Sequence, residues 1–288
     1  MKRIIAALVG IIIMSGTMMS TVTVGEMRFH CADDTTRINA LLGAGAQSGL
    51  ESPGKLMSFY AHELLGTPYV GHTLEGETEQ LTINIHELDC TTFVETLVAL
   101  TITTINGRRS WLDYAANLEA IRYRRGVMDG YGSRLHYISD WIVNNTARGH
   151  VREITADFPR VVYQIKTLDY MSRHRDSYPA LADDTVLERI KDIEGGYRSH
   201  RYPLIKKGDL RQRNMRTAFT DGDIVCLVTK TEGLDVSHLG IIENVDGAPH
   251  LLHASSLAKK VIIDPNDLAD MLQNSRTNQG VRIIRVIE

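Results

Sequence analysis

One cysteine of this sequence lies where a helix is expected to begin. Cys90 follows Asp89 and opens a run, residues 91–95 with the sequence Thr-Thr-Phe-Val-Glu, in which apolar side chains start to recur at helical spacing. Asp89 is a suitable N-cap, and the unpaired N–H groups and dipole of a helix start favour a thiolate over a thiol. We therefore expect Cys90 to be a nucleophile, although a buried first-turn cysteine beside a simple cap would give the same pattern.

A cysteine nucleophile needs a base, and the base needs a group that orients it. Of the 11 histidines, His238 and His253 lie in two neighbouring apolar runs that are typical of strands, and Asp246-Gly247 between the runs is the dipeptide most suited to a two-residue hairpin turn. With that turn, Gly240 faces His253, and His238 is a diagonal neighbour on the same face, roughly 7 Å away. A different turn length would separate the two rings. The spacing predicts His238 as base and His253 as its orienting partner.

These three residues would suit the hydrolysis of an amide. We expect His238 to take the proton of Cys90, the sulfur to attack the carbonyl, and N–H groups at the helix start to stabilise the oxyanion. His253 would hold the tautomer of His238, which then protonates the leaving amine before water releases the acyl group. The sequence has no His-Glu-x-x-His and no Cys-x-x-Cys, so neither a metal site nor a cofactor is predicted.

Helices dominate the first part of the chain and strands the last. No repeat or linker is visible, so residues 26–288 are predicted to form one domain of the α+β class, with an antiparallel meander at its end. Apolar periodicity and helix-ending residues predict helices over residues 38–65, 90–105, 113–124, 138–146 and 185–193, and β-branched runs predict strands over 224–229, 238–243, 250–255 and 281–287.

The N-terminus has the order of a secretory signal peptide. Lys2 and Arg3 precede an apolar run over 4–14 and small or hydroxyl residues over 15–23. A retained membrane anchor is the alternative, but the apolar run is shorter than the roughly 20 residues that span a bilayer. We expect residues 1–25 to be removed and the protein to be exported to the periplasm, with no stable membrane insertion.

Composition excludes other classes of function. The chain has 288 residues, 43% hydrophobic and 23% charged, with a net charge of −3, which is typical of a globular protein and gives no polycationic surface for nucleic acid. Three cysteines, Cys31, Cys90 and Cys226, would leave at least one free thiol in an oxidising compartment. Cys226 lies in an apolar run and is expected in the core.

Three blocks of the sequence, in order, resemble the NlpC-type cell-wall cysteine peptidases. They are Leu-Gly-Thr-Pro-Tyr at 65–69, the segment 89–95 around the cysteine, and the two histidine runs. The resemblance implies a papain-like fold with the nucleophile at a helix start packed on an antiparallel sheet, and Tyr69 beside the active site. Thr91-Thr92 departs from the common Ser-Gly, and the two glycines after the tyrosine are missing.

A long insertion favours one branch of that superfamily. About 130 residues separate Cys90 from the strand-rich end, with Ser-Arg-Leu-His-Tyr-Ile-Ser-Asp-Trp at 133–141, and this resembles N-acetylmuramoyl-L-alanine amidases that act on anhydro-muropeptides. The resemblance implies cleavage between the muramoyl lactyl group and L-alanine of peptidoglycan fragments, and a mainly helical recognition insertion over about 107–215. Candidate substrate-binding residues are Tyr69, Asp89, Arg134, His136 and Tyr137; Arg122, Arg124, Arg125, Tyr131 and Trp141 could also contribute, or could equally be core or surface residues.

Three other functions remain open from the sequence. A γ-D-glutamyl endopeptidase of the stem peptide would use the same residues on a different bond. Acyl transfer involving lipid would need an apolar approach surface, which the Arg- and Tyr-rich insertion does not suggest. A non-catalytic muropeptide-binding protein is the alternative of another class, although such proteins would tolerate loss of Cys90 or His238, and both are present.

Overall fold

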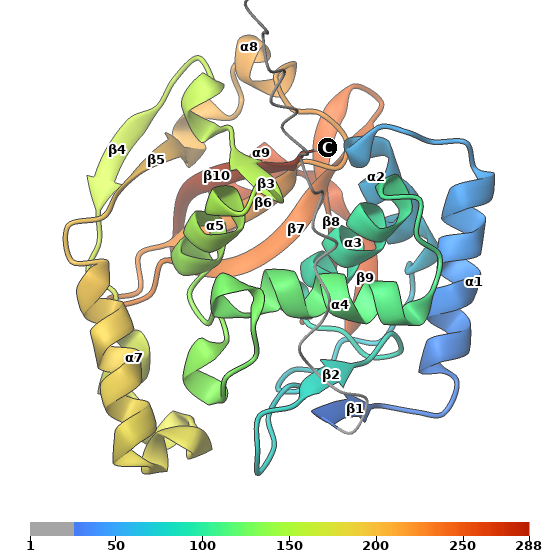
Figure 1. Ribbon diagram of the computed structural model, residues 1–288. Helices are drawn as coiled ribbons and strands as arrows, with labels where there is room; N and C mark the ends of the chain where they lie inside the picture. The colour runs from blue at the N-terminus through green and yellow to red at the C-terminus, as the bar shows by residue number, and fades with distance from the viewer. Residues whose placement is uncertain (1–25, 288) are drawn as a thin grey trace, which may run out of the picture.

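A computed structural model describes residues 26–287, and the predicted signal peptide over 1–25 lies outside the described residues. In this part of the chain the centre is an antiparallel sheet of eight strands in the order β4-β5-β10-β6-β7-β8-β9, with β3 also beside β10 (Figure 1). A parallel pair, β1 (Met27–Phe29) with β2 (Leu81–Ile83), stands apart. The sheet strands are β3 (Val151–Glu153), β4 (Val162–Ile165), β5 (Arg201–Lys206), β6 (Ile224–Thr229), β7 (Val236–Val245), β8 (Ala248–Ser255), β9 (Lys260–Asp267) and β10 (Asn278–Val286).

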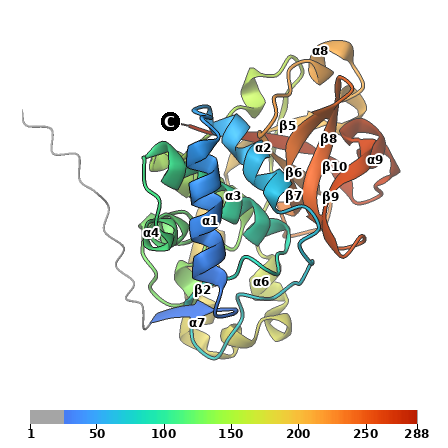
Figure 2. The ribbon, with the colours of Figure 1, turned by 90° about the vertical axis from the view of Figure 1, so that its right-hand side faces the viewer.

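Helices cover both faces of the sheet (Figure 2). Alternate residues of the strands point to opposite sides, so Ile241 and Leu252 join the core under α3, whereas Ile242 and Leu251 join a second core with α9. None of the described helices is long and apolar enough to cross a membrane. The helices are α1 (Asp34–Gln47), α2 (Pro53–Glu63), α3 (Cys90–Ile105), α4 (Trp111–Arg122), α5 (Ile138–Ala147), α6 (Tyr170–Arg173), α7 (Asp184–Gly196), α8 (Arg213–Arg216) and α9 (Leu268–Asn274).

The α+β class is confirmed, and so are the predicted helices and strands to within a few residues. The predicted bounds of α3 and β6 agree with the structure. The meander needs a correction, because β10 returns beside β6 instead of following β9. β9 was not expected: it is an edge strand that carries Asp264, Pro265 and Asp267, and charges and proline are typical of edges.

The insertion is mainly helical, as its sequence suggests. It contributes β3, β4 and β5 to the central sheet in addition to its helices. Its helix α7 packs in a separate small core that includes Tyr137, Leu181 and Ile190. These three strands were not predicted, because short strands that pair with distant parts of the chain leave a weak local signal.

The predicted hairpin register is confirmed. Val245 pairs with Ala248 and the ladder continues to Ile241 and Leu252. The turn residues Asp246 and Gly247 have φ of 50° and 79°, the left-handed values that a two-residue type I′ turn requires.

One buried arginine ties the insertion to the sheet. Arg282 of β10 is fully buried and donates to Glu153 of β3 at 2.7 and 3.0 Å and to Ser139 of α5 at 2.7 Å. Its guanidinium also lies over the Tyr202 ring of β5, 4.6 Å from the centroid.

We expect Arg282→Ala to lower the free energy of unfolding by about 2–4 kcal/mol, because it removes a fully buried side chain and leaves the partly buried Glu153 carboxylate and the Ser139 hydroxyl unpaired. Urea titration of the variant measures this. Arg211→Ala is the control, since Arg211 pairs with Asp270 on the surface and should change stability little. Equal, small effects of both substitutions would contradict the account.

Candidate active site

Cys90 is the first residue of α3, and Asp89 caps the helix. The Asp89 carboxylate accepts hydrogen bonds from the N–H groups of Thr91 at 3.0 Å and Thr92 at 2.8 Å, and the Thr92 hydroxyl accepts from the Asp89 N–H at 2.9 Å. This reciprocal capping box fixes where the helix starts. The backbone of Leu239, the residue after His238, is close enough to the Cys90 thiol to lower its pKa.

The electrostatics of Cys90 differ from the sequence expectation of a ready thiolate. Burial and the neighbouring Asp89 charge raise the pKa of Cys90 to about 11, while the Leu239 backbone, Thr91 and the N–H of Cys90 itself oppose the shift. Desolvation of the sulfur explains most of the difference, and the charge of the capping Asp89 adds to it. The free site therefore holds a neutral thiol.

The two predicted histidines meet on one face of the sheet. His238 Nε2 and His253 Nδ1 are hydrogen-bonded at 2.5 Å, with the rings perpendicular and their centroids 4.8 Å apart. Gly240 makes room for this contact, since a Cβ there would lie 2.9 Å from the His253 Cβ. Burial, and then the charge of His253, lower the pKa of His238 to about 3, so His238 is neutral and able to accept a proton.

Tyr69 is held beside Cys90 by backbone hydrogen bonds on both sides. Its N–H donates to Lys259 O at 2.9 Å, and Leu88 N–H donates to Pro68 O at 3.0 Å. The segment is thus fixed between β9 and the residues that lead into α3. The pKa of Tyr69 is raised by partial burial and by the charges of Cys90 and Asp89, which is consistent with a phenol close to the thiol.

The candidate substrate residues of the insertion lie among other protein groups. Arg134 is 6% exposed, and its guanidinium lies 2.9 Å from Glu75 and 3.5 Å from Glu79. His136 donates from Nε2 to the Tyr131 carbonyl at 2.9 Å, and burial and Arg134 lower its pKa to about 3. These contacts are those of residues that hold the insertion together.

Other candidates from the insertion are also engaged. The Tyr137 hydroxyl donates to Glu194 at 2.7 Å. Arg122 pairs with Glu95 at 2.7 Å, both side chains being almost fully buried. The remaining candidates comprise two buried aromatics, a paired arginine and an exposed one: Trp141, Tyr131, Arg124 (with Asp140) and Arg125.

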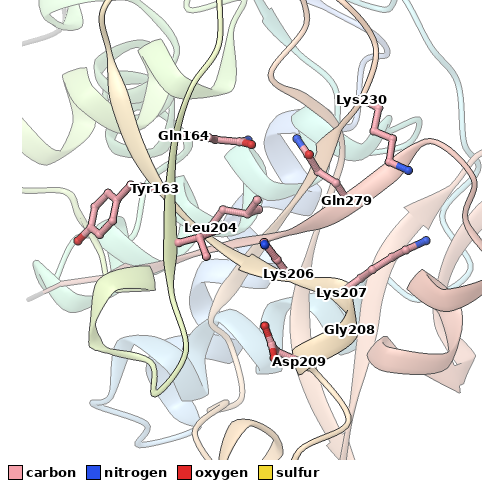
Figure 3. A pocket seen from close by; sticks show the side chains of 10 residues that line it. Tyr163, Gln164, Leu204, Lys206, Lys207, Gly208, Asp209, Lys230 and Gln279 are labelled. Carbon is pink, nitrogen blue, oxygen red and sulfur yellow. The ribbon is translucent and has the colours of Figure 1, made fainter.

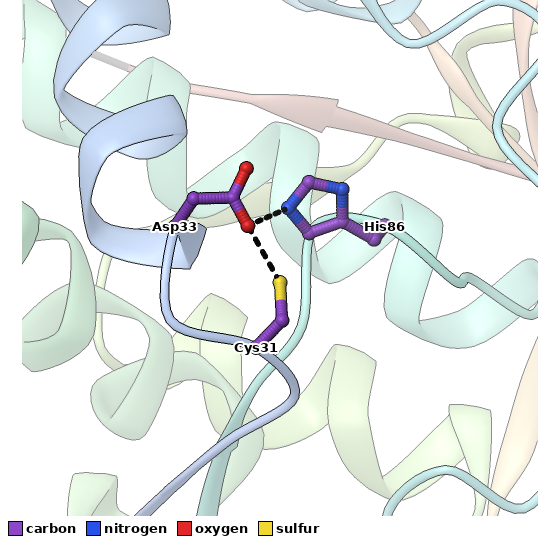
Figure 4. Close-up of side chains that lie close together, drawn as sticks. All are labelled: Cys31, Asp33 and His86. Atoms are coloured by element: carbon purple, nitrogen blue, oxygen red, sulfur yellow. Dashed lines mark hydrogen bonds and ion pairs between the residues drawn. The ribbon is translucent and has the colours of Figure 1, made fainter.

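A second group of chemistry-bearing side chains lies apart from these residues (Figure 4). The Cys31 thiol donates to Asp33 at 2.8 Å, and His86 Nε2 lies 3.3 Å from the same carboxylate oxygen. Among the described residues this is the group whose ligand atoms are close enough to hold a metal ion. The hydrogen bond to Asp33 raises the pKa of Cys31. Cys226 is buried in the core, as expected.

The groove drawn in Figure 3 is separate from the candidate site. It has a volume of about 820 Å³ and contains none of Cys90, His238 and His253. It is lined by residues of β4 and β5 with three lysines, among them Lys206 and Lys230.

One residue near the site was missed by the sequence analysis. Asp264 Oδ2 of β9 lies 3.8 Å from His253 Nε2. Its strand was not predicted, so no register argument could bring it to the histidines. The run Val261-Ile262-Ile263 would have been the signal.

Comparison with known proteins assigns the family. The N-acetylmuramoyl-L-alanine amidase-like family (AmiA-like) matches residues 60–281, so the chain belongs to this family. No curated protein matches the chain. Family and fold together support a hydrolase of the amidase type with a peptidoglycan-derived substrate.

Solved structures agree with this assignment. An N-acetylmuramoyl-L-alanine amidase from Bacteroides uniformis is 37% identical, covers 82% of this chain and 99% of its own, and superposes with a TM-score of 0.77. A Bacteroides fragilis protein provisionally named a xylanase is 38% identical over 78% of this chain and 98% of its own, with a TM-score of 0.73. A Legionella pneumophila protein at 20% identity, covering 88% and 95%, with a TM-score of 0.67, shares the fold.

Gly240→Ala should disturb the histidine pair. The added Cβ would lie 2.8 Å from the Leu252 carbonyl oxygen and 2.9 Å from the His253 Cβ. We expect the free energy of unfolding to fall by about 1–3 kcal/mol, measured by thermal unfolding. Turnover should fall further than the loss of folded protein alone would explain. Gly43→Ala in α1 is the matched control, because its Cβ would meet nothing within 4 Å. Wild-type stability and activity in Gly240→Ala would refute the close contact.

Alkylation of Cys90 by iodoacetamide should report its raised pKa. Because the thiolate reacts and the pKa is about 11, the rate should be low at neutral pH and climb as pH rises beyond 9. Peptide mapping follows Cys90 separately from the other cysteines. In denatured protein the same thiol should titrate near about 8.5. A plateau already reached below pH 7 would instead indicate a preformed thiolate–imidazolium pair.

Proposed function

We propose that this chain is an N-acetylmuramoyl-L-alanine amidase that uses Cys90, His238 and His253 to cleave the amide between (anhydro-)N-acetylmuramic acid and L-alanine in peptidoglycan fragments. The observation that carries the proposal is the 2.5 Å contact between His238 of β7 and His253 of β8, beside Leu239, whose backbone lowers the pKa of Cys90. Membership of the amidase-like family supports the choice of bond.

The first half of the reaction forms an acyl enzyme. The thiol proton of Cys90 passes to neutral His238 as the sulfur attacks the lactyl carbonyl carbon, because the low pKa of His238 and the high pKa of Cys90 both disfavour an ion pair in the free site. His253 accepts the Nε2–H of His238 and shares the positive charge that develops. His238 then protonates the L-alanine nitrogen, the C–N bond breaks, and a thioester to Cys90 remains.

Water completes the reaction. His238 takes a proton from water, the hydroxide oxygen attacks the thioester carbonyl, and the carboxylic acid leaves as the Cys90 thiol is re-formed. The Cys90 N–H, which the Asp89 cap leaves unused, and the Tyr69 hydroxyl are our candidates for stabilising the oxyanion.

Substrate contacts are assigned on the same basis. Tyr69 is half-buried beside the thiol, and Asp89 holds the helix start, so these two belong to the site itself. Arg134, His136 and Tyr137 support the insertion, through which they would shape the fragment's approach.

The order of motifs and the position of Cys90 on α3 also favour placing the chain in the NlpC-type, papain-like superfamily. Lys2, Arg3 and the apolar run 4–14 favour export to the periplasm.

The proposal is tested by incubating the mature protein with a defined anhydro-muramoyl tetrapeptide and identifying the products by mass spectrometry. We expect release of the intact tetrapeptide with a free L-alanine amine, and a loss of at least about 10³-fold in Cys90→Ala. The control is Cys31→Ser, which replaces a half-buried thiol bonded to Asp33 and should keep wild-type turnover.

Two results would change the assignment. A Cys90-dependent cut inside the stem peptide would keep the nucleophile and indicate the γ-D-glutamyl endopeptidase. Binding of the fragment without turnover by the wild type would indicate a muropeptide-binding protein.

A further inference from the structure

A carboxylate continues the row of histidines across a third strand. His253 of β8 pairs with Ile262 of β9, and Asp264 lies two residues further along β9. Side chains two apart on a strand share a face, so His238, His253 and Asp264 follow one another on neighbouring strands β7, β8 and β9.

The Asp264 side chain is held toward His253. Its Oδ1 accepts hydrogen bonds from the N–H of Asn266 at 2.9 Å and from the Asn266 side-chain amide at 3.2 Å. Its backbone carbonyl accepts from His250 Nδ1 at 2.8 Å. The other carboxylate oxygen of Asp264, Oδ2, faces His253 and lies 3.8 Å from its Nε2.

The His253 nitrogen that faces Asp264, Nε2, has no hydrogen-bond partner among the described residues. His253 is 6% exposed, and this nitrogen is buried. An ionised carboxylate only accepts hydrogen bonds, so Asp264 favours the tautomer in which Nε2 carries the proton.

This preference fixes the protons of both rings. If His253 Nε2 carries the proton, its Nδ1 is an acceptor, and His238 Nε2 must then donate across the 2.5 Å contact. The neutral His238 ring consequently has its lone pair on Nδ1, the nitrogen that is free to serve as base. In the opposite arrangement His253 Nδ1 donates to His238 Nε2, and His238 Nδ1 already carries a proton.

We propose that Asp264 is a positioning residue that sets the tautomers of His253 and His238 and so keeps His238 able to accept the Cys90 proton. The inference rests on the proposed Cys90–His238–His253 function, and it adds a carboxylate that the sequence analysis did not include. The Asp264 charge also opposes the burial that lowers the pKa of His253, so it stabilises the charge that develops when His238 is protonated. The other titratable groups around this row are His250 on β8, which bonds the Asp264 carbonyl, and Asp89 with Cys90 at the start of α3.

The tautomers can be observed without substrate. In ¹⁵N-histidine-labelled mature protein, two-bond ¹H–¹⁵N spectra should report His253 with the proton on Nε2 and His238 with its lone pair on Nδ1. Asp264→Asn should move His253 toward the Nδ1-protonated form, because an amide can also donate, and Asp264→Glu should restore the wild-type pattern. A wild-type His253 protonated on Nδ1, or spectra unchanged in Asp264→Asn, would overturn the proposal.

Turnover gives the second readout. We expect Asp264→Asn to lower kcat by about 10–100-fold with KM nearly unchanged, the range typical of groups that orient a catalytic residue. Asp270→Asn is the matched control, because Asp270 is a carboxylate of the adjacent helix α9 that pairs with Arg211 on the surface. Wild-type kcat in Asp264→Asn would also overturn the proposal.

The design separates this inference from the proposed function. If Cys90→Ala keeps its activity, the proposed function fails, while the histidine spectra still decide the role of Asp264. If Asp264→Asn does not fold, Asn266→Ala replaces it: this variant keeps the carboxylate, removes one donor to its Oδ1, and should shift tautomer and kcat in the same direction by a smaller amount. No shift in Asn266→Ala together with an inactive but folded Asp264→Glu would contradict the account.

Discussion

The register of the β7–β8 hairpin determines whether the two proposed catalytic histidines meet. Side chains alternate along a strand, so a slip of one residue would turn His253 to the face of the sheet opposite His238. The type I′ turn at Asp246-Gly247 fixes this register at one end. Apolar side chains fix it along its length, because Ile241 belongs to the core on one face and Ile242 to the core on the other.

The same packing keeps the thiol and the two imidazoles uncharged at rest. Burial disfavours charge on both the thiol and the imidazoles, and Asp89 adds a negative charge beside the sulfur while it holds the helix start. The positive end of the helix dipole is too weak to reverse these two effects. In the proposed mechanism the proton of Cys90 therefore moves as the sulfur attacks, and it passes to a histidine whose lone pair faces the sulfur.

The sequence predicts the parts of the molecule that local patterns specify. The cap and apolar spacing after Asp89 were sufficient for α3, and Asp246-Gly247 was sufficient for the contact of the histidines. Strands β4, β5 and β9 pair with segments far away or lie at the sheet edge, so local alternation gives little sign of them. Tyr69 was identified by resemblance, whereas Asp264 requires the β8–β9 register.

Charge and burial were the harder quantities to predict. Arginine is a residue type that binds substrate carboxylates, so Arg134 and Arg122 were candidates. In the structure Arg134 pairs with Glu75 and Glu79, and Arg122 pairs with Glu95. Glu95 lies within the predicted helix α3, but the residue it would meet depends on how α4 packs against it. The thiolate expectation likewise considered the helix dipole without the desolvation of the sulfur.

The most direct test of the central claim is a crystal structure of the Cys90→Ala protein with the anhydro-muramoyl tetrapeptide bound. The account predicts that the lactyl carbonyl carbon lies about 3–3.5 Å from the place of the missing sulfur, with His238 Nδ1 facing that place and His253 still bonded to His238. A fragment bound only in the lysine-lined groove, or a His238 ring turned away from residue 90, would contradict it.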